Sequence, residues 1–274
     1  MIRISINRVA MVVTLVALLA GAALAQTPTE KAWEILNAAA IDSNAGKRTG
    51  AMAALGLIKR DAKAQSLAEK GLADEKPEVR ASAANALGDM GATGAAPNLK
   101  KAIKDTDVGV VLAAAHALYV LKQPSAYEVY YAILTGEKKS GQGLVAEQKK
   151  MLSDPKKMAQ FGFETGVGFI PFGGLGLGAL KAVTKDDVSP VRAAAAKILA
   201  NDPDPKSGEA LVTAASDKSW IVRAAALDAI ARRGEHSLAA KIEPQMDDEK
   251  DIVKYLAAAA VIHLNAEPMA KGRK

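Results

Sequence analysis

The residues of this chain that could bind a metal ion are its three histidines and the carboxylates next to them. An iron site built this way needs at least two histidine–carboxylate pairs that converge. His116 is followed by alanine, His236 by serine and His263 by leucine, and the reversed pair Glu235-His236 occurs once. The sequence therefore predicts no metal site, and we interpret His116 and His263 as polar edges of packed helices.

Glycine-rich patterns at 166–168 and 174–178 raise the question of a phosphate-binding loop. Such a loop follows a strand and leads into Lys-Ser or Lys-Thr, and neither feature is found here. The stretch Asn201–Lys206 lacks the ligand number of a calcium loop, so it is interpreted as an inter-helix turn, with weak calcium binding as a minor alternative. No triad or paired-carboxylate spacing is informative. We therefore predict no cofactor, no catalytic residue and a protein that is not an enzyme.

The first 25 residues predict export to the periplasm or the medium. Arg3 and Arg8 flank the start of an uncharged apolar run that ends in Ala23-Leu24-Ala25, which is typical of signal-peptide cleavage before Gln26. An uncleaved N-terminal anchor is the alternative. The chain has no cysteine, which excludes disulfides and thiol catalysis. Cleavage would leave 34 of the 36 basic residues against 30 acidic ones, and this mild charge on an exported chain argues against a nucleic-acid partner.

A repeated pattern of aspartate, valine and arginine organises the rest of the chain. Most copies have valine five residues and arginine six residues after an anchoring aspartate, and then alanine and leucine at helical spacing. A leucine or isoleucine recurs six residues before an aspartate, at Leu99, Leu180, Leu211 and Ile242. The steps between aspartates are 32, 31, 81, 31 and 31 residues, for the anchors Asp42, Asp74, Asp105, Asp186, Asp217 and Asp248. The pattern predicts units of two short helices with a turn at the aspartate.

Each residue of the pattern has a predicted physical role. The aspartate is expected to be the N-cap and turn former of the second helix, with proline in the first turn at Pro77 and Pro190. One helix pair cannot bury its apolar face alone, so the units must stack into an array. The arginine is expected to reach the aspartate turn of its own or an adjacent unit by charge-assisted hydrogen bonds. This structural ladder comprises Asp42, Arg48, Asp74, Arg80, Asp186, Arg192, Asp217 and Arg223.

The unit resembles the HEAT repeat, in the short form known from phycobilisome-lyase-like proteins. The resemblance covers about residues 42–265 and is carried by Asp74, Val79, Arg80, Ala83, Leu87, Gly88 and their counterparts. It implies an all-α fold, a right-handed α-solenoid of about six to seven helix-pair repeats with a concave surface formed by the second helices. Some relatives, of the deoxyhypusine-hydroxylase type, bind iron through His-Glu dipeptides, which this sequence lacks.

The step between Asp105 and Asp186 is longer than two repeats of the usual length, which predicts one central insertion. We therefore expect a signal peptide at 1–25, a capping helix at 26–41, N-terminal repeats at 42–136, a degenerate repeat with a Phe/Gly-rich insertion at 137–173, C-terminal repeats at 174–265 and a polar tail at 266–274.

The insertion contains all four phenylalanines of the chain. It is open to three interpretations: a tight helix crossing, an exposed contact for a partner or lipid, and a membrane span that Pro171 would interrupt. Our leading prediction is a scaffold that binds an unidentified protein partner on its concave face. The alternatives are an envelope-associated protein that uses the insertion for membrane contact or self-association, and a lyase- or hydroxylase-type enzyme. The predicted contact residues are Phe161, Phe163, Phe169, Phe172, Tyr127, Tyr130 and Tyr131.

Overall fold

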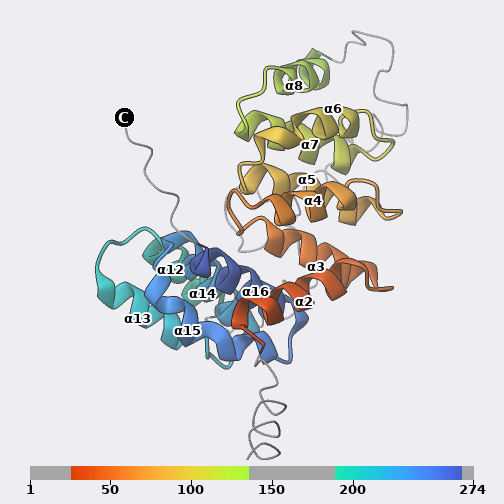
Figure 1. The fold of residues 1–274 in the computed structure, drawn as a ribbon. Coiled ribbons are helices and arrows are strands. Elements are labelled where there is room, and N and C mark those ends of the chain that lie inside the picture. The colour runs from red at the N-terminus through yellow and green to blue at the C-terminus, as the bar shows by residue number, and fades with distance from the viewer. Residues whose placement is uncertain (1–25, 136–188, 267–274) are drawn as a thin grey trace, which may run out of the picture.

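The computed structural model describes residues 26–135 and 189–266, and within them the chain forms helices and no strand (Figure 1). The first helices of the units are α2 (Pro28–Ala40), α4 (Ala62–Gly71), α6 (Ala96–Ala102), α8 (Ser125–Thr135), α13 (Pro205–Ala214) and α15 (Ala239–Ile242). The second helices are α3 (Ala45–Leu55), α5 (Pro77–Asp89), α7 (Val108–Val120), α12 (Ser189–Leu199), α14 (Trp220–Arg233) and α16 (Asp251–Asn265). Short 3₁₀ turns η1 (Thr93–Ala95), η2 (His236–Leu238) and η3 (Glu243–Asp247) lie beside α6 and α15. The predicted all-α solenoid is confirmed.

The anchoring aspartates shape the turn between the two helices of a unit. The carboxylate of Asp74 accepts a hydrogen bond from the backbone N–H of Lys76 at 2.9 Å, and α5 begins at the next residue. The same bond to the residue two positions later is made by Asp42, Asp105, Asp217 and Asp248. These aspartates are therefore turn formers, as predicted, but they are not the N-caps, which lie two positions further along.

The helices stack in an order that differs from their order along the chain. The second helices form the row α12, α14, α16, α3, α5 and α7, so the last described helix packs against the first two (Figure 1). We call the interface of α16 with α2 and α3 the seam. Polar contacts also cross it, because Asn265 Nδ2 donates to Thr29 Oγ1 at 3.4 Å and Lys31 Nζ lies 2.7 Å from Asp247 Oδ2. The helix expected as a cap at 26–41 thus packs between α16 and α3, and among the described residues the array ends at α8 and α12.

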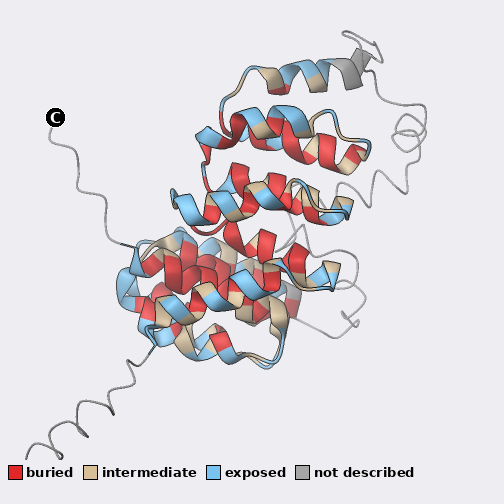
Figure 2. Ribbon diagram, turned by 45° about the vertical axis from the view of Figure 1, so that its right-hand side comes forward, coloured by how far each residue is buried: buried red, intermediate tan, exposed pale blue. Residues whose placement is uncertain are grey.

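Alanine and leucine fill the core between the two layers of helices (Figure 2). Leu99, Leu211 and Ile242, which the repeat pattern places on the first helices, are at most 1% exposed. Helix α16 is surrounded by α14, α15, α2 and α3, and residues 257–261 of this helix are fully buried. Small side chains let the helices approach closely: a Cβ atom on Gly88 of α5 would lie 2.8 Å from the Cα of Ala117 on α7.

Candidate functional site

Bidentate arginine–aspartate bridges join neighbouring units. Arg48 Nε donates to Asp74 Oδ2 at 2.7 Å and Nη2 to Oδ1 at 2.9 Å, while Nη1 donates to the carbonyl oxygen of Asp42 at 2.9 Å. Each guanidinium thereby ties the turn of its own unit to the aspartate of the next. Bidentate bridges also pair Arg80 with Asp105 and Arg223 with Asp248, whereas Arg192 donates to Asp217 through Nη1 alone. Asp186, the remaining predicted member, lies outside the described residues.

The ladder is part of the fold and offers little surface to a ligand. The side chains of Arg48 and Asp74 are 10% and 13% exposed, and those of Arg223 and Asp248 are 11% and 9% exposed. Asp42 accepts no bridge from another unit among the described residues; its carboxylate lies 3.2 Å from Lys47 Nζ on the adjoining helix. The function of the protein must therefore be sought on other side chains.

Acid should weaken the ladder. The hydrogen bond from Arg48 lowers the pKa of Asp74 from its ordinary value near 3.8. A carboxyl with a lowered folded-state pKa contributes stability above its ordinary pKa and loses that contribution as the pH falls through the lowered value. We expect Asp74→Asn to be less stable than the parent at about pH 7 and to lose less stability between about pH 5 and about pH 3. Urea unfolding across this range measures both effects.

The control for this pH series is Asp247→Asn, because Asp247 forms an exposed pair with Lys31. This variant should follow the parent protein at each pH, since exposed pairs contribute at most about 1 kcal/mol. Equal acid sensitivity of the parent and Asp74→Asn would contradict the role given to the bridge.

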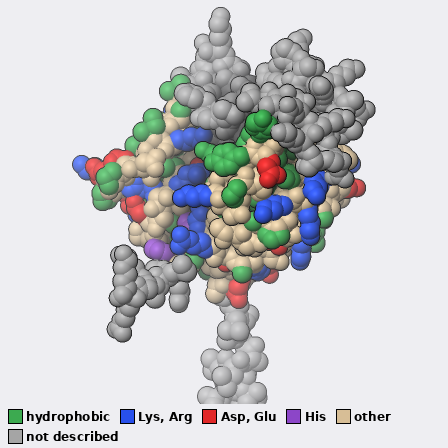
Figure 3. Space-filling model, turned by 90° about the horizontal axis from the view of Figure 1, so that it is seen from above, with side chains coloured by type: hydrophobic (Ala, Val, Ile, Leu, Met, Phe, Trp, Pro, Cys, Tyr) green, Lys and Arg blue, Asp and Glu red, His purple; other side chains and the backbone are tan. Residues whose placement is uncertain are grey.

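The predicted aromatic contact residues fall partly outside the described part of the chain. Tyr127, Tyr130 and Tyr131 lie on α8 at one end of the row and are 62%, 37% and 52% exposed. The ring of Tyr127 meets that of Tyr119 on α7 edge to face, with centroids 6.1 Å apart. The face seen from this end carries more basic than acidic side chains (Figure 3). The predicted phenylalanines, Phe161, Phe163, Phe169 and Phe172, lie outside the described residues.

No helix within residues 26–135 and 189–266 is long and apolar enough to cross a lipid bilayer.

Charged side chains from both halves of the chain come together at the C-terminal ends of the second helices. The Lys59 ammonium donates to the backbone carbonyl of Asp89, and the Lys59 N–H lies 3.5 Å from His263 Nδ1 across the seam. Arg232 Nε donates to Asp228 Oδ2 at 2.8 Å. We call this group the concave cluster; it comprises Lys59, Asp89, His116, Asp228, Arg232 and His263.

The concave cluster brings charged groups from the two sides of the seam within electrostatic reach of each other. Arg232 on α14 and Asp89 on α5 each influence the pKa of the other, although α16 and α3 lie between them in the row. Packed helices are about 8–10 Å apart, so a flat row would separate α14 from α5 by roughly 25–30 Å. Screening would remove most of the interaction at that distance. The side chains of Arg232 and Asp89 therefore reach toward each other across the seam.

Burial shifts the pKa values of charged groups in the concave cluster. It raises the pKa of Asp89, although Lys59, Arg232 and His116 oppose that shift. It lowers the pKa of Lys59, against the attraction of Asp89. Burial, with Lys59 and His236, also lowers the pKa of His263. Since Asp89, Lys59 and Arg232 remain open to solvent, the cluster is a partly desolvated surface that an oppositely charged ligand can reach.

Within the described residues, no group of three or more histidines and carboxylates is placed to hold a metal ion.

The sequence contains a pattern that could have identified the concave cluster. His116 and Asp228 occupy the same position of their units, and Asp89, Arg232 and His263 share the position one helical turn further along. Positions four apart lie on one face of a helix, so polar residues at these two positions of a mainly apolar helix mark one surface. The sequence alone predicts His116 and His263 as separate polar edges of packed helices, whereas both belong to the concave cluster.

Solved structures similar to this chain include a hydroxylase and a lyase complex, and one family model matches the sequence. The TM-scores of these two structures are low, so neither informs the function of this chain. Human deoxyhypusine hydroxylase in complex with glycerol is 19% identical, with 85% of this chain and 84% of that chain covered and a TM-score of 0.31. The complex of CpcE and CpcF of phycocyanin lyase from Nostoc is 22% identical, with 86% and 94% covered and a TM-score of 0.34. No curated protein matches the sequence. The family model for HEAT repeats matches residues 68–140 and 178–262, more than half of the chain, so this protein belongs to the HEAT-repeat family.

Proposed function

We propose that this protein is an exported, non-enzymatic scaffold that binds a protein partner on its concave face. The observation that carries the proposal is the concave cluster, where residues from five units in both halves of the chain contribute titratable groups to one surface. Arrays of this type commonly bind partners through extended concave surfaces. Burial disfavours the charged forms of Asp89 and Lys59, so a partner that supplies opposite charges would gain from pairing with them.

A matched pair of double variants tests the surface. Asp89→Asn with Arg232→Gln removes one charge of each sign from the concave cluster and leaves the net charge unchanged. Glu69→Gln with Lys70→Gln does the same on α4, a first helix.

A photo-crosslinking residue at exposed His116 should capture a defined partner from an envelope extract, whereas one at exposed Ser66 on α4 should not. The concave double variant should reduce capture about tenfold, and the α4 variant should leave it unchanged.

Equal capture from His116 and Ser66, or equal loss in both double variants, would count against a concave binding face. Export is tested separately by N-terminal sequencing of protein recovered from its natural host, where we expect the mature chain to begin at Gln26.

The ends of the row support a second candidate, an envelope-associated protein that self-associates. Val191 and Ile198 on α12 are 71% and 73% exposed, and Tyr127 on α8 is 62% exposed. Apolar residues at the ends of an array favour end-to-end contacts. Under this alternative, sedimentation would show concentration-dependent association that Ile198→Lys abolishes, and the concave double variant would have no effect.

A further inference from the structure

The seam differs from the other interfaces between second helices in the residues that face each other. At each of the other interfaces, the second helix that comes first in the row has a small side chain seven residues after its anchoring aspartate. These residues are Thr49, Ala81, Ala193 and Ala224. The seam has Tyr255 at this position. Gly50 of α3 accommodates the ring, because a Cβ atom on Gly50 would lie 3.2 Å from Tyr255 Cδ2. The seam therefore pairs a large side chain, Tyr255, with a glycine, Gly50, where the other interfaces have small side chains.

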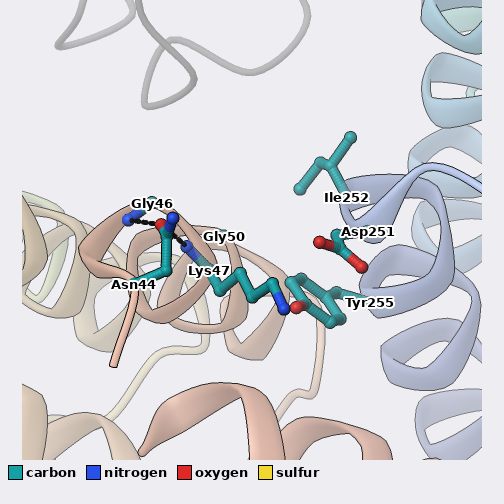
Figure 4. A pocket seen from close by; sticks show the side chains of 7 residues that line it. All are labelled: Asn44, Gly46, Lys47, Gly50, Asp251, Ile252 and Tyr255. Carbon is teal, nitrogen blue, oxygen red and sulfur yellow. Dashed lines mark hydrogen bonds between the residues drawn. The ribbon is translucent and has the colours of Figure 1, made fainter. Parts of the chain in front are cut away.

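The seam also lacks an arginine bridge among the described residues. Lys254 occupies the arginine position of the unit that contains α16, and its ammonium lies 3.7 Å from Asp251 on the same helix. The aspartate that an arginine would reach, Asp42, pairs with Lys47 instead. A pocket of about 300 Å³ lies at this place, between the N-terminal ends of α3 and α16 (Figure 4). It is lined by Asn44, Gly46, Lys47, Gly50, Asp251, Ile252 and Tyr255.

Tyr255 brings an unpaired hydroxyl to this pocket. The residue is 5% exposed, and its hydroxyl has no hydrogen-bond partner among the described residues. Burial, with the nearby carboxylates of Asp251 and Asp42, raises the pKa of Tyr255 to about 12. The hydroxyl therefore stays protonated at ordinary pH and can donate a hydrogen bond. The hydroxyl faces the pocket without a protein partner in the described part of the chain, so a charged ligand acceptor here would gain a hydrogen bond from it.

The remaining polar groups of the pocket carry charges of opposite sign. Lys47 extends from α3 toward the ring of Tyr255, and Asp251 projects from α16 beside it (Figure 4). The ammonium of Lys47 has three N–H groups, so its pairing with Asp42 leaves donors free. The Asn44 side-chain oxygen accepts the N–H of Gly46 at 2.8 Å, which leaves the amide NH₂ as a further donor. The pocket thus offers several donors for an anionic group and one carboxylate for a cationic group.

We propose that the seam pocket binds a small α-amino acid as its zwitterion. The ligand carboxylate accepts hydrogen bonds from Lys47 and the Tyr255 hydroxyl, and the ligand ammonium donates to Asp251. The apolar edge formed by Ile252 and the Tyr255 ring suits a short side chain. Because these groups come from α3 and α16, the bound ligand bridges the two halves where the arginine ladder is interrupted. This inference is independent of the proposed protein partner.

Calorimetric titration of the purified chain with three related probes tests the proposal. L-alanine carries both charges, L-alaninamide lacks the carboxylate and L-lactate lacks the ammonium. We expect saturable one-to-one binding of L-alanine and at least about tenfold weaker binding of the other two, because each loses a charge-assisted contact. Glycine and L-serine serve as alternative small zwitterions. No saturation with any of the three amino acids by about 10 mM, or equal affinity for L-lactate or L-alaninamide, would overturn the proposal.

Two variants connect binding to this pocket. Tyr255→Phe removes only the hydroxyl and should weaken L-alanine binding about tenfold or more, whereas Tyr127→Phe on exposed α8 should leave binding unchanged. Gly50→Ala should push the Tyr255 ring into the pocket and weaken binding further. Unchanged affinity in Tyr255→Phe would overturn the assignment even if Gly50→Ala fails to fold.

Discussion

Replacing Arg223 with alanine is expected to lower the free energy of unfolding by about 3–5 kcal/mol. Arg223 Nε and Nη2 donate to the two carboxylate oxygens of Asp248 at 2.7 and 2.8 Å, and Nη1 donates to the carbonyl of Asp217 at 3.0 Å. The variant leaves Asp248, 9% exposed, with a desolvated charge and no counter-ion from the neighbouring unit. The loss therefore combines the missing hydrogen bonds with the cost of the unpaired carboxylate. Urea unfolding followed by circular dichroism measures it.

The control for Arg223 is Lys241→Ala. Lys241 pairs with Glu209 between two first helices, and these side chains are 45% and 62% exposed. An exposed pair of this kind contributes at most about 1 kcal/mol, so the control should lie close to the parent. Similar losses in both variants would show that the ladder is no more than a surface feature.

An aspartate in place of Ala260 is expected to destabilise the fold by more than about 4 kcal/mol. Ala260 is fully buried in α16, which is enclosed by α14, α15, α2 and α3. A carboxylate there has no room, no counter-ion and no access to water. If the units were stacked in chain order, α16 would end the row with one open face, and the same change could be accommodated by solvent. Urea unfolding of the variant and the parent protein measures the difference.

Ile198→Asp is the matched control for Ala260→Asp. Ile198 and Ala260 occupy equivalent positions of their units, but α12 is the end of the row among the described helices and Ile198 is 73% exposed. This substitution should change the free energy of unfolding by no more than about 0.5 kcal/mol. A mild effect of Ala260→Asp would contradict the burial of α16 at the seam.

The repeat pattern predicts what is local to one unit. The aspartate turn at Asp74, the burial of Leu99 and Ile242, and the helical class all follow from spacings within a single unit. These are properties of one helix pair, where hydrogen-bond geometry and the apolar face leave few alternatives. The predicted N-cap is wrong by two positions because aspartate serves equally well as a cap and as a turn former.

The order of the units could not be predicted in this way. The faces that stack on each other are rich in alanine, so many pairings of units bury similar apolar area, and periodicity does not distinguish them. The concave cluster escapes sequence analysis for the same reason, since Asp89 and Arg232 come together only when α16 packs on α3. Tyr255 and Gly50 are minor departures from the repeat in the sequence, and only the structure places them face to face.

The seam also has a consequence for how the chain folds. Most contacts of a solenoid join residues a few tens of positions apart, which keeps contact order low and folding fast. The contact of Asn265 with Thr29 spans 236 residues, and that of Lys31 with Asp247 spans 216. Closing a loop of that size costs entropy before it gains contacts, so each half should assemble first from local pairs and the seam should form last. Until then α2 presents its apolar face to solvent, and during synthesis it must wait for α16 to cover it.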